Sequence, residues 1–241
     1  MIEITVLASG SRGNCYRIND GSTPLLLECG IPYKEIQKGL NFRLSELAGC
    51  LISHEHQDHC KAILDVIKAG IDCYMSQGTA GALGVSGHRV RMAAAKYLFE
   101  IGTLMIMPFE TQHDADQPLG FLVYSTRTCE KLLYATDTYY IRYKFPGLTH
   151  IMVECNYIRD ILEANVSAGL VPLALRNRLL ESHFSLENVK AFLQANDLGQ
   201  VKGIWLIHMS ETNCDPARAK REIQEMTGLP VYIAQEVALC R

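Results

Sequence analysis

Short apolar segments separated by glycine, proline and polar residues dominate the chain, and most have the length of a strand. Residues 2–8 alternate and then run apolar, and two further short runs follow at 15–18 and 24–27. Polar and glycine residues punctuate these runs, which predicts a meander of three strands. Later apolar runs predict further strands at 50–53, 72–75, 104–108, 121–125, 132–135, 151–153, 204–207 and 231–234, with 121–125 paired to 132–135.

Helical patterns lie between these strands. In residues 60–69, apolar positions recur at helical spacing and Gly70 follows them, which predicts a helix that ends there. The pair Asp215-Pro216 predicts a helix start, with Asp as the N-cap and Pro in the first turn. Further helices are predicted at 32–40, 77–83, 158–180 with a break at 167–169, 186–195 and 216–226.

The predicted strands share a feature at their ends. Near-continuous apolar strands are covered on both faces, so helices are expected to flank the sheets of a layered α/β core. We expect one domain over residues 1–241. Five apolar runs stop at a histidine or a carboxylate, and ligands at strand ends gather along one edge of such a core. These residues are His54, His113, Asp137, Glu154 and His208.

Composition narrows the class of protein. The 241 residues are 48% hydrophobic with a net charge of −3, so a sizeable core is expected and no global basic field for nucleic acid. Nine cysteines without a CxxC pair predict buried free thiols in a reducing cytosol. We find no signal-peptide pattern and no uncharged apolar run of ~18 residues, so a soluble cytoplasmic protein with no membrane segment is expected.

The segment 53–59 carries the candidate chemistry, because it places three histidines and an aspartate directly after an apolar run. Side chains two apart in an extended segment point the same way, so His54 and His56 converge on one metal ion. Asp58 and His59 then face a second ion. A tetrahedral site needs about four ligands, so other residues must complete both sites. The alternative is that Asp58 only caps the next helix and that the histidines form a chance surface cluster.

Most of the other histidines also follow apolar runs or lie at motifs. Together with His113, Asp137 and His208, the HxHxDH motif at 54–59 resembles the metallo-β-lactamase superfamily, in which ligands occur in this order. The resemblance implies a four-layer αββα sandwich over nearly the whole chain. It also implies two divalent ions (Zn, Mn or Fe), one on His54, His56 and His113, the other on Asp58, His59 and His208, with Asp137 bridging both.

Smaller motifs resemble one branch, the WalJ-like (YycJ-like) exonucleases. These motifs are LASGSRGN at 7–14, TDT at 136–138, ECNY at 154–157, SHFS at 182–185 and IHMSETN at 207–213. The chain departs from the branch pattern at Cys155, Phe184 and Met209, none of which is a metal ligand in this interpretation. The paired histidine segments also resemble tRNA 3′-processing ribonuclease Z, whose long tRNA-gripping arm has no obvious counterpart here.

The branch implies a metal-dependent phosphodiester hydrolase, a DNA exonuclease. Two ions can share a water molecule, lower its pKa and stabilise both oxygens of an in-line displacement. In this hypothesis Asp58 orients or deprotonates the water, and His183 binds the phosphate or protonates the leaving oxygen. Glu154 holds His183 or a metal-binding histidine in its tautomer. The alternatives are that His183 merely precedes a helix and that Glu154 is a structural carboxylate.

A basic aromatic segment, 139–145, and the arginines at 159, 176 and 178 could grip a nucleic acid backbone. The alternative is that these arginines form a solvated helix face. Two other functions stay open: a small-molecule metallo-hydrolase (thioesterase, lactonase or cyclic-nucleotide phosphodiesterase), which the acidic net charge favours, and a non-catalytic metal-binding protein. The sequence also leaves open DNA against RNA, the native metal and a homo-oligomeric state.

Overall fold

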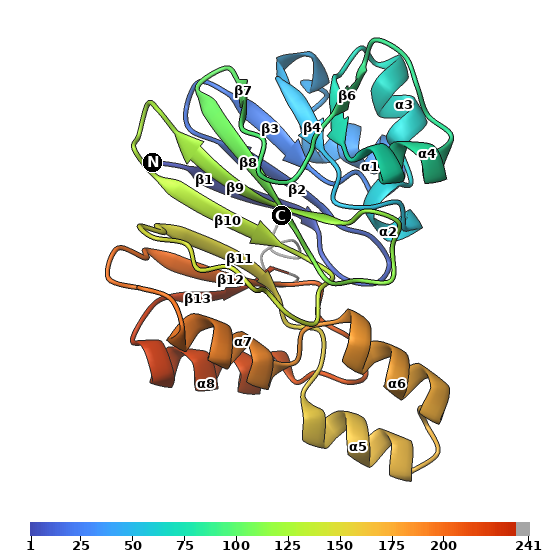
Figure 1. Cartoon of the computed structure of the whole chain (residues 1–241), viewed down its shortest axis with the longest axis vertical. Coiled ribbons are helices and arrows are strands. Elements are labelled where there is room, and N and C mark those ends of the chain that lie inside the picture. Colours follow the sequence, from blue (N-terminus) through green and yellow to red (C-terminus); the bar gives the residue numbers. More distant parts are fainter. Residues whose placement is uncertain (235–241) are drawn as a thin grey trace.

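The predicted N-terminal meander opens the first of two sheets in the computed structural model, which describes residues 1–234 (Figure 1). Strands β1 (Glu3–Ala8), β2 (Cys15–Asn19) and β3 (Pro24–Leu27) pair antiparallel. The chain then adds β4 (Gly49–Leu51), β5 (Cys73–Met75) and β6 (Val90–Met92), each parallel to its neighbour. The sheet therefore runs in sequence order from β1 to β6.

The second sheet has seven strands in the order β13-β12-β11-β10-β9-β8-β7. The predicted pairing of 121–125 with 132–135 is confirmed by the antiparallel β9 (Leu119–Ser125) and β10 (Lys131–Ala135). Parallel pairing continues from β10 through the last strands. The sequence prediction missed β6 and β7, which are only three residues long. The remaining strands are β7 (Phe99–Ile101), β8 (Leu104–Glu110), β11 (His150–Glu154), β12 (Gly203–Ile207) and β13 (Val231–Ile233).

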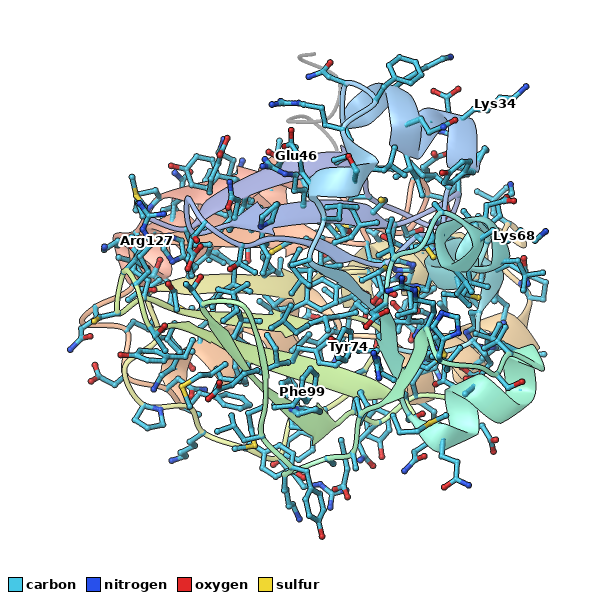
Figure 2. All side chains as sticks on the ribbon, turned by 90° about the horizontal axis from the view of Figure 1, so that it is seen from above. Lys34, Glu46, Lys68, Tyr74, Phe99 and Arg127 are labelled. Carbon is cyan, nitrogen blue, oxygen red and sulfur yellow. The ribbon has the colours of Figure 1, made fainter. Side chains whose placement is uncertain are left out.

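An apolar core joins the two sheets face to face. It contains buried side chains of both, such as Leu27 and Leu51 from the first sheet and Phe121 and Leu132 from the second. Figure 2 shows Tyr74 and Phe99 between the sheets, and their rings stack with centroids 5.1 Å apart. Charged side chains such as Lys68 lie at the periphery in the same view. Burial of apolar surface on both inner faces is the main force that holds the layers together.

Helices cover the outer face of each sheet, so the predicted four-layer αββα sandwich is confirmed (Figure 1). Helices α7 (Leu186–Gln194) and α8 (Pro216–Thr227) pack on the second sheet. A hairpin of α5 (Arg159–Ser167) and α6 (Leu173–Ser182) projects from this layer, with the break between its helices as predicted. The first sheet is covered by α1 (Tyr33–Gly39), the 3-10 turn η1 (Leu44–Glu46), α2 (Gln57–Cys60), α3 (Ile63–Lys68) and α4 (Gln77–Leu83).

Local signals set several helix ends correctly. Asp215 accepts a hydrogen bond from the Arg218 amide, as an N-cap should. The prediction of one helix over residues 60–69 was wrong, because α2 begins inside the histidine motif and the helix breaks after Cys60. The reason is tertiary: the Cys29 amide donates to the His59 carbonyl, and the Cys29 carbonyl accepts from the Ala62 amide. These bonds to the segment that follows β3 replace helical ones.

All eight cysteines among residues 1–234 are free thiols, and seven of them are buried. Cys129 is exposed, because it lies in the tight β9–β10 turn with a φ of 57°. The prediction that the cysteines are buried is therefore wrong for Cys129. Cys240 lies outside the described residues. None of the helices within residues 1–234 is both long and apolar enough to cross a bilayer.

Candidate metal centre

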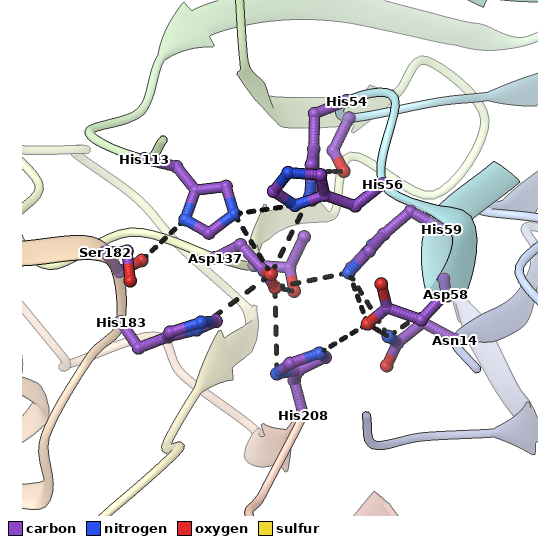
Figure 3. A network of polar contacts seen from close by, with 12 residues as sticks. Asn14, His54, His56, Asp58, His59, His113, Asp137, Ser182, His183 and His208 are labelled. Carbon is purple, nitrogen blue, oxygen red and sulfur yellow. Dashed lines mark hydrogen bonds and ion pairs between the residues drawn. The ribbon is translucent and has the colours of Figure 1, made fainter. Parts of the chain in front are cut away.

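The carboxyl ends of parallel strands from both sheets bring the predicted ligands to one edge of the sandwich. The HxHxDH loop follows β4, whereas Asp137 follows β10 and His208 follows β12. His113 lies in the connection from β8 to β9. Figure 3 shows these side chains pointing toward one another. The strand ends therefore meet at one edge, as the apolar pattern predicted, and this edge includes strands of both sheets.

One group of ligand atoms comes from three histidines and Asp137, and these atoms all lie within 4.8 Å of one another. The His56 Nδ1 atom is 3.1 Å from both His54 Nε2 and His113 Nε2. Asp137 Oδ2 lies 3.5 Å from His113 Nε2 and 3.7 Å from His54 Nε2. Three ring nitrogens and one carboxylate oxygen thus surround a single point.

A second group combines Asp58, His59, His208 and again Asp137, with its ligand atoms also within 4.8 Å of one another. His59 Nε2 lies 3.3 Å from Asp58 Oδ2 and 3.4 Å from Asp137 Oδ1. The Asp58 Oδ2 atom is 3.0 Å from His208 Nε2. Asp137 therefore turns one oxygen toward each group, as a bridging carboxylate would.

The hydrogen bonds around these rings leave lone pairs without donors. His113 Nδ1 lies 2.8 Å from the Ser182 carbonyl, which can only accept, so Nδ1 carries the proton and Nε2 presents a lone pair. That lone pair faces the ring nitrogen of His56. Several converging nitrogen and carboxylate lone pairs in a buried space need a cation between them. The donor set is nitrogen and oxygen, which suits first-row divalent metal ions.

The electrostatics of the site favour a bound cation. Burial lowers the pKa of His54 well below its ordinary value, so the imidazole stays neutral and able to ligate. Burial opposes ionisation of Asp137, but His208 and His59 outweigh it and lower the pKa of the carboxyl. Burial also opposes a charge on His208, yet Asp137 and then Asp58 raise the pKa of that imidazole to about 10. The carboxylates that draw a proton onto His208 create the negative potential that attracts a metal ion.

Backbone strain accompanies two of these positions. Asp137 has a φ of 36° and His208 a φ of 51°, both in the left-handed region that non-glycine residues seldom adopt. Such conformations cost about 1–3 kcal/mol each and persist where the surrounding fold fixes them. The fold therefore aims both side chains at the cluster at a cost in stability.

Glu154 and His183, predicted as partners in catalysis, are in contact. His183 Nδ1 lies 2.5 Å from Glu154 Oε1, and Glu154 Oε2 accepts the amides of Thr138 and Phe184. His208 Nδ1 is 3.3 Å from Glu154 Oε1. Asp137, Glu154, His183 and His208 form a third group at ligand distances. Since the Glu154 oxygens already accept N–H groups, we interpret this group as a hydrogen-bond cluster.

Sequence reasoning missed Glu28, which is fully buried beneath the metal loop. Its carboxylate accepts the Ser53 amide and the Tyr134 hydroxyl, and Oε1 is 3.8 Å from His59 Nδ1. The φ of Glu28 is 62°. A signal was present, because Glu28 ends the apolar run 24–27 in the same way as the five recognised residues end theirs.

Asn14 was also missed as a site residue, although the motif 7–14 was recognised. Its Nδ2 lies 3.3 Å from His59 Nε2 and donates to the Gly10 carbonyl. Gly30 allows the loops to approach, since a Cβ there would lie 1.7 Å from the Asp58 carbonyl oxygen. A side chain at position 30 would therefore displace the metal loop.

The segment 139–145, which could grip a nucleic acid backbone according to its sequence, is in part buried. Ile141 and Phe145 are buried in the core beneath α7. Tyr143 donates to Glu110, and Arg142 lies 3.8 Å from the same carboxylate. The alternation of apolar and polar positions reflects a strap whose alternate side chains turn inward. The segment therefore exposes fewer aromatic side chains to a nucleic acid than its sequence indicates.

An open cleft of about 340 Å³ leads to the metal groups. Its lining includes Asp58, Asp137, His183 and His208, so two of the three predicted catalytic side chains, Asp58 and His183, reach it. Glu154 lies behind His183 and is fully buried. The arrangement can hold metal ions at the floor of the cleft while a ligand enters from solvent.

The chain is similar to known proteins over most of its length. Residues 33–209 match the family model described as "Beta-lactamase superfamily domain". The chain is 25% identical to "Exodeoxyribonuclease YycJ" of Bacillus anthracis over 93% of this chain and 89% of that protein. It is 28% identical to "Exodeoxyribonuclease WalJ" of Streptococcus pneumoniae over 87% of this chain and 82% of that protein.

Among solved structures, the fold is similar to that of the metallo-beta-lactamase fold protein YhfI from Bacillus subtilis, with a TM-score of 0.73. The two sequences are only 15% identical, and the match covers 97% of this chain and 96% of that one. The likeness therefore concerns the fold.

Proposed function

Because this chain belongs to the β-lactamase superfamily, we propose that it is a metal-dependent nuclease that removes nucleotides from DNA ends. The observation that carries the proposal is the pair of histidine and aspartate groups that share Asp137 at the floor of an open cleft. DNA is the proposed substrate because the two curated relatives are named exodeoxyribonucleases. Both sheets supply ligands, which supports one hydrolase domain over residues 1–241.

One divalent ion would be held by His54, His56 and His113 and a second by Asp58, His59 and His208, and Asp137 would serve both groups. The donor set accepts Zn, Mn or Fe. When bound, two such ions supply a nucleophilic water at neutral pH and stabilise the charge that develops on a phosphodiester. No thiol takes part in either group among the described residues, and Cys155 packs in the apolar core.

Asp58 lies at the boundary between the metal groups and the cleft, with its side chain 25% exposed. His59 and His208 hold its Oδ2 atom in place. Burial opposes ionisation of Asp58, but these two histidines outweigh it and lower the pKa of the carboxyl. An ionised, fixed carboxylate at this position would orient the attacking water or accept its proton.

His183 and Glu154 would supply the second proton transfer. The Nδ1–H group of His183 donates to Glu154, which leaves Nε2 on the side of the ring away from Glu154. Burial lowers the pKa of His183, but Glu154 outweighs this effect and raises it above the ordinary value. A protonated Nε2 would donate to the phosphate or to the leaving 3′ or 5′ oxygen. Glu154 acts through His183 as a positioning residue.

The test is incubation of Mn²⁺- or Zn²⁺-loaded protein with end-labelled single- and double-stranded DNA and RNA and with a lactone panel. We expect stepwise shortening of DNA from an end. Asp137→Ala is the matched inactive control, because it removes the carboxylate that both metal groups share.

The outcomes separate the functions that the sequence left open. Shortening of RNA alone would replace DNA as the substrate, and cleavage of the lactones alone would overturn the nuclease proposal in favour of a small-molecule hydrolase. Metal binding without turnover of any substrate would leave only a metal-binding protein.

A further inference from the structure

Helix α6 forms one wall of the metal cleft. Leu175, Arg178 and Leu179 line the cleft from this helix, together with Ser11, Ser210 and Thr212 from loops elsewhere in the chain. Among residues 1–234, Arg178 is the only lysine or arginine in the lining. A cleft that accepts a polyanion needs cationic groups at the phosphates, so this one guanidinium stands out on chemical grounds.

The guanidinium of Arg178 is fixed by one carboxylate and otherwise free. Its Nε atom donates to Asp114 Oδ2 at 2.7 Å, and Asp114 directly follows the predicted ligand His113. Within residues 1–234, Nη1 and Nη2 donate to no protein acceptor. A guanidinium that is anchored through Nε and keeps its two Nη groups free can bind a phosphate in a defined orientation.

Stability gives no alternative reason for this ion pair. The side chains of Arg178 and Asp114 are 54% and 43% exposed. Ion pairs this exposed contribute only about 0–1 kcal/mol to folding. Asp114 raises the pKa of Arg178, and Asp137 and Asp58 add to the effect, so the guanidinium stays charged and lies in the field of the metal groups.

Arg178 lies at a different depth of the cleft from the metal groups, so the two sites can bind different phosphates of one DNA strand. Asp137 and His208 lie at the floor, each with a side chain only 4% exposed, whereas Arg178 lies at the exposed rim. The phosphate that reacts must reach the floor. A neighbouring phosphate of the same strand would lie nearer the rim, where Arg178 can bind it, and Leu175 and Leu179 offer an apolar surface for the nucleoside between the two phosphates.

We propose that Arg178, Leu175 and Leu179 form a nucleotide subsite at the rim of the cleft, which binds the phosphate next to the bond that is cleaved. The proposal rests on the nuclease function proposed above and deepens it. Arg178 acts on substrate binding and not on the chemical step. Asp114 is its positioning residue.

The chain offers a matched control on the same helix. Arg176 lies two residues away and is held by Glu163 of α5, and it is absent from the cleft lining. Arg178→Gln and Arg176→Gln therefore remove the same charge from the same helix, but only the first removes it from the cleft. Both variants should keep the metal content and the melting temperature of the parent protein.

The experiment compares two substrates in metal-loaded full-length protein: a short single-stranded DNA and bis(4-nitrophenyl) phosphate, which has one phosphodiester and no neighbouring phosphate. Arg178→Gln should raise KM for the DNA by roughly tenfold to 100-fold with little change in kcat. It should also lower the slope of log KM against log salt by about 0.7. Hydrolysis of bis(4-nitrophenyl) phosphate should not change, and Arg178→Lys should recover part of the DNA affinity.

Three results would overturn the subsite. In the first, Arg178→Gln has the same KM for DNA as Arg176→Gln. In the second, it lowers kcat equally on both substrates, which would place Arg178 at the reacting phosphate. In the third, the parent protein hydrolyses bis(4-nitrophenyl) phosphate but no nucleic acid, and this result alone removes the nuclease function as well.

Discussion

Two buried polar clusters lie at opposite ends of the strands, and they balance their charges in different ways. The first surrounds Asp20, which follows β2 and is only 3% exposed. Its Oδ1 accepts the amides of Ser22 and Thr23, and its Oδ2 accepts the hydroxyls of Thr103 and Ser125. Burial opposes ionisation of Asp20, but these neutral donors outweigh it and lower its pKa to about 2.

The second cluster is the metal centre. It contains more acceptors than the first, and its histidine and carboxylate lone pairs face one another with too few donors between them. A buried carboxylate whose donors belong to the chain ties loops together, whereas a buried cluster of unshared lone pairs needs an external cation. The number of hydrogen-bond donors that the chain itself supplies therefore distinguishes a structural cluster from a metal site.

The largest expected effect tests this separation directly. Asp137→Ala should remove both bound metals or weaken them strongly and lower kcat/KM by roughly 10³-fold or more, since one carboxylate serves both groups. Metal analysis of the purified protein and the DNA assay measure the two effects. Asp20→Asn is the matched control, because it also removes a buried carboxylate. Equal loss of activity in both variants would contradict the comparison.

His183→Ala should have the next largest effect. We expect the protein to keep both metals and lose about 10²-fold to 10⁴-fold in kcat, the usual contribution of a general acid or base. Metal stoichiometry is measured beside turnover, so that loss of metal is not mistaken for loss of proton transfer. Full activity in this variant would remove His183 from the mechanism.

Removal of metal should destabilise the protein through the metal centre and not through the Asp20 cluster. A ligand present at about 1,000 times its Kd stabilises the folded state by about 4 kcal/mol. Chelation should therefore lower the melting temperature of the parent protein, and it should lower that of Asp20→Asn by the same amount. Differential scanning calorimetry with and without Mn²⁺ or Zn²⁺ measures both shifts. A metal effect that depends on Asp20 would show that the two clusters are coupled.

Asp20→Asn should have the smallest effect, a loss of roughly 1–3 kcal/mol of folding free energy with normal activity per folded molecule. The lowered pKa of Asp20 means that its ionised form stabilises the fold above the unfolded pKa near 3.8 and that this contribution is lost as pH falls toward about 2. Denaturant unfolding at pH 7 and pH 2.5 checks this difference. The gap between parent and variant should narrow at the lower pH, and a constant gap would exclude the charge as its cause.

The sequence by itself determined the layered fold and most of the candidate ligands. Apolar runs predicted strands and their shared edge, and the cap at Asp215 predicted a helix start, because periodicity and capping depend on residues adjacent in the chain. The HxHxDH motif at 54–59 lies within one loop, so its spacing is also local information. The remaining ligands followed from their order along the chain and from the resemblance to a known family.

Tertiary structure decided everything that depends on which segments meet. Cys29 breaks the helix after Cys60, and Glu28 supports the metal loop, because β3 and that loop are neighbours only in the folded chain. Nothing in the sequence distinguishes Arg176, which pairs with α5, from Arg178, which faces the cleft. The physical reason is that backbone preferences extend over a few residues, whereas the partner of a side chain depends on how the layers pack.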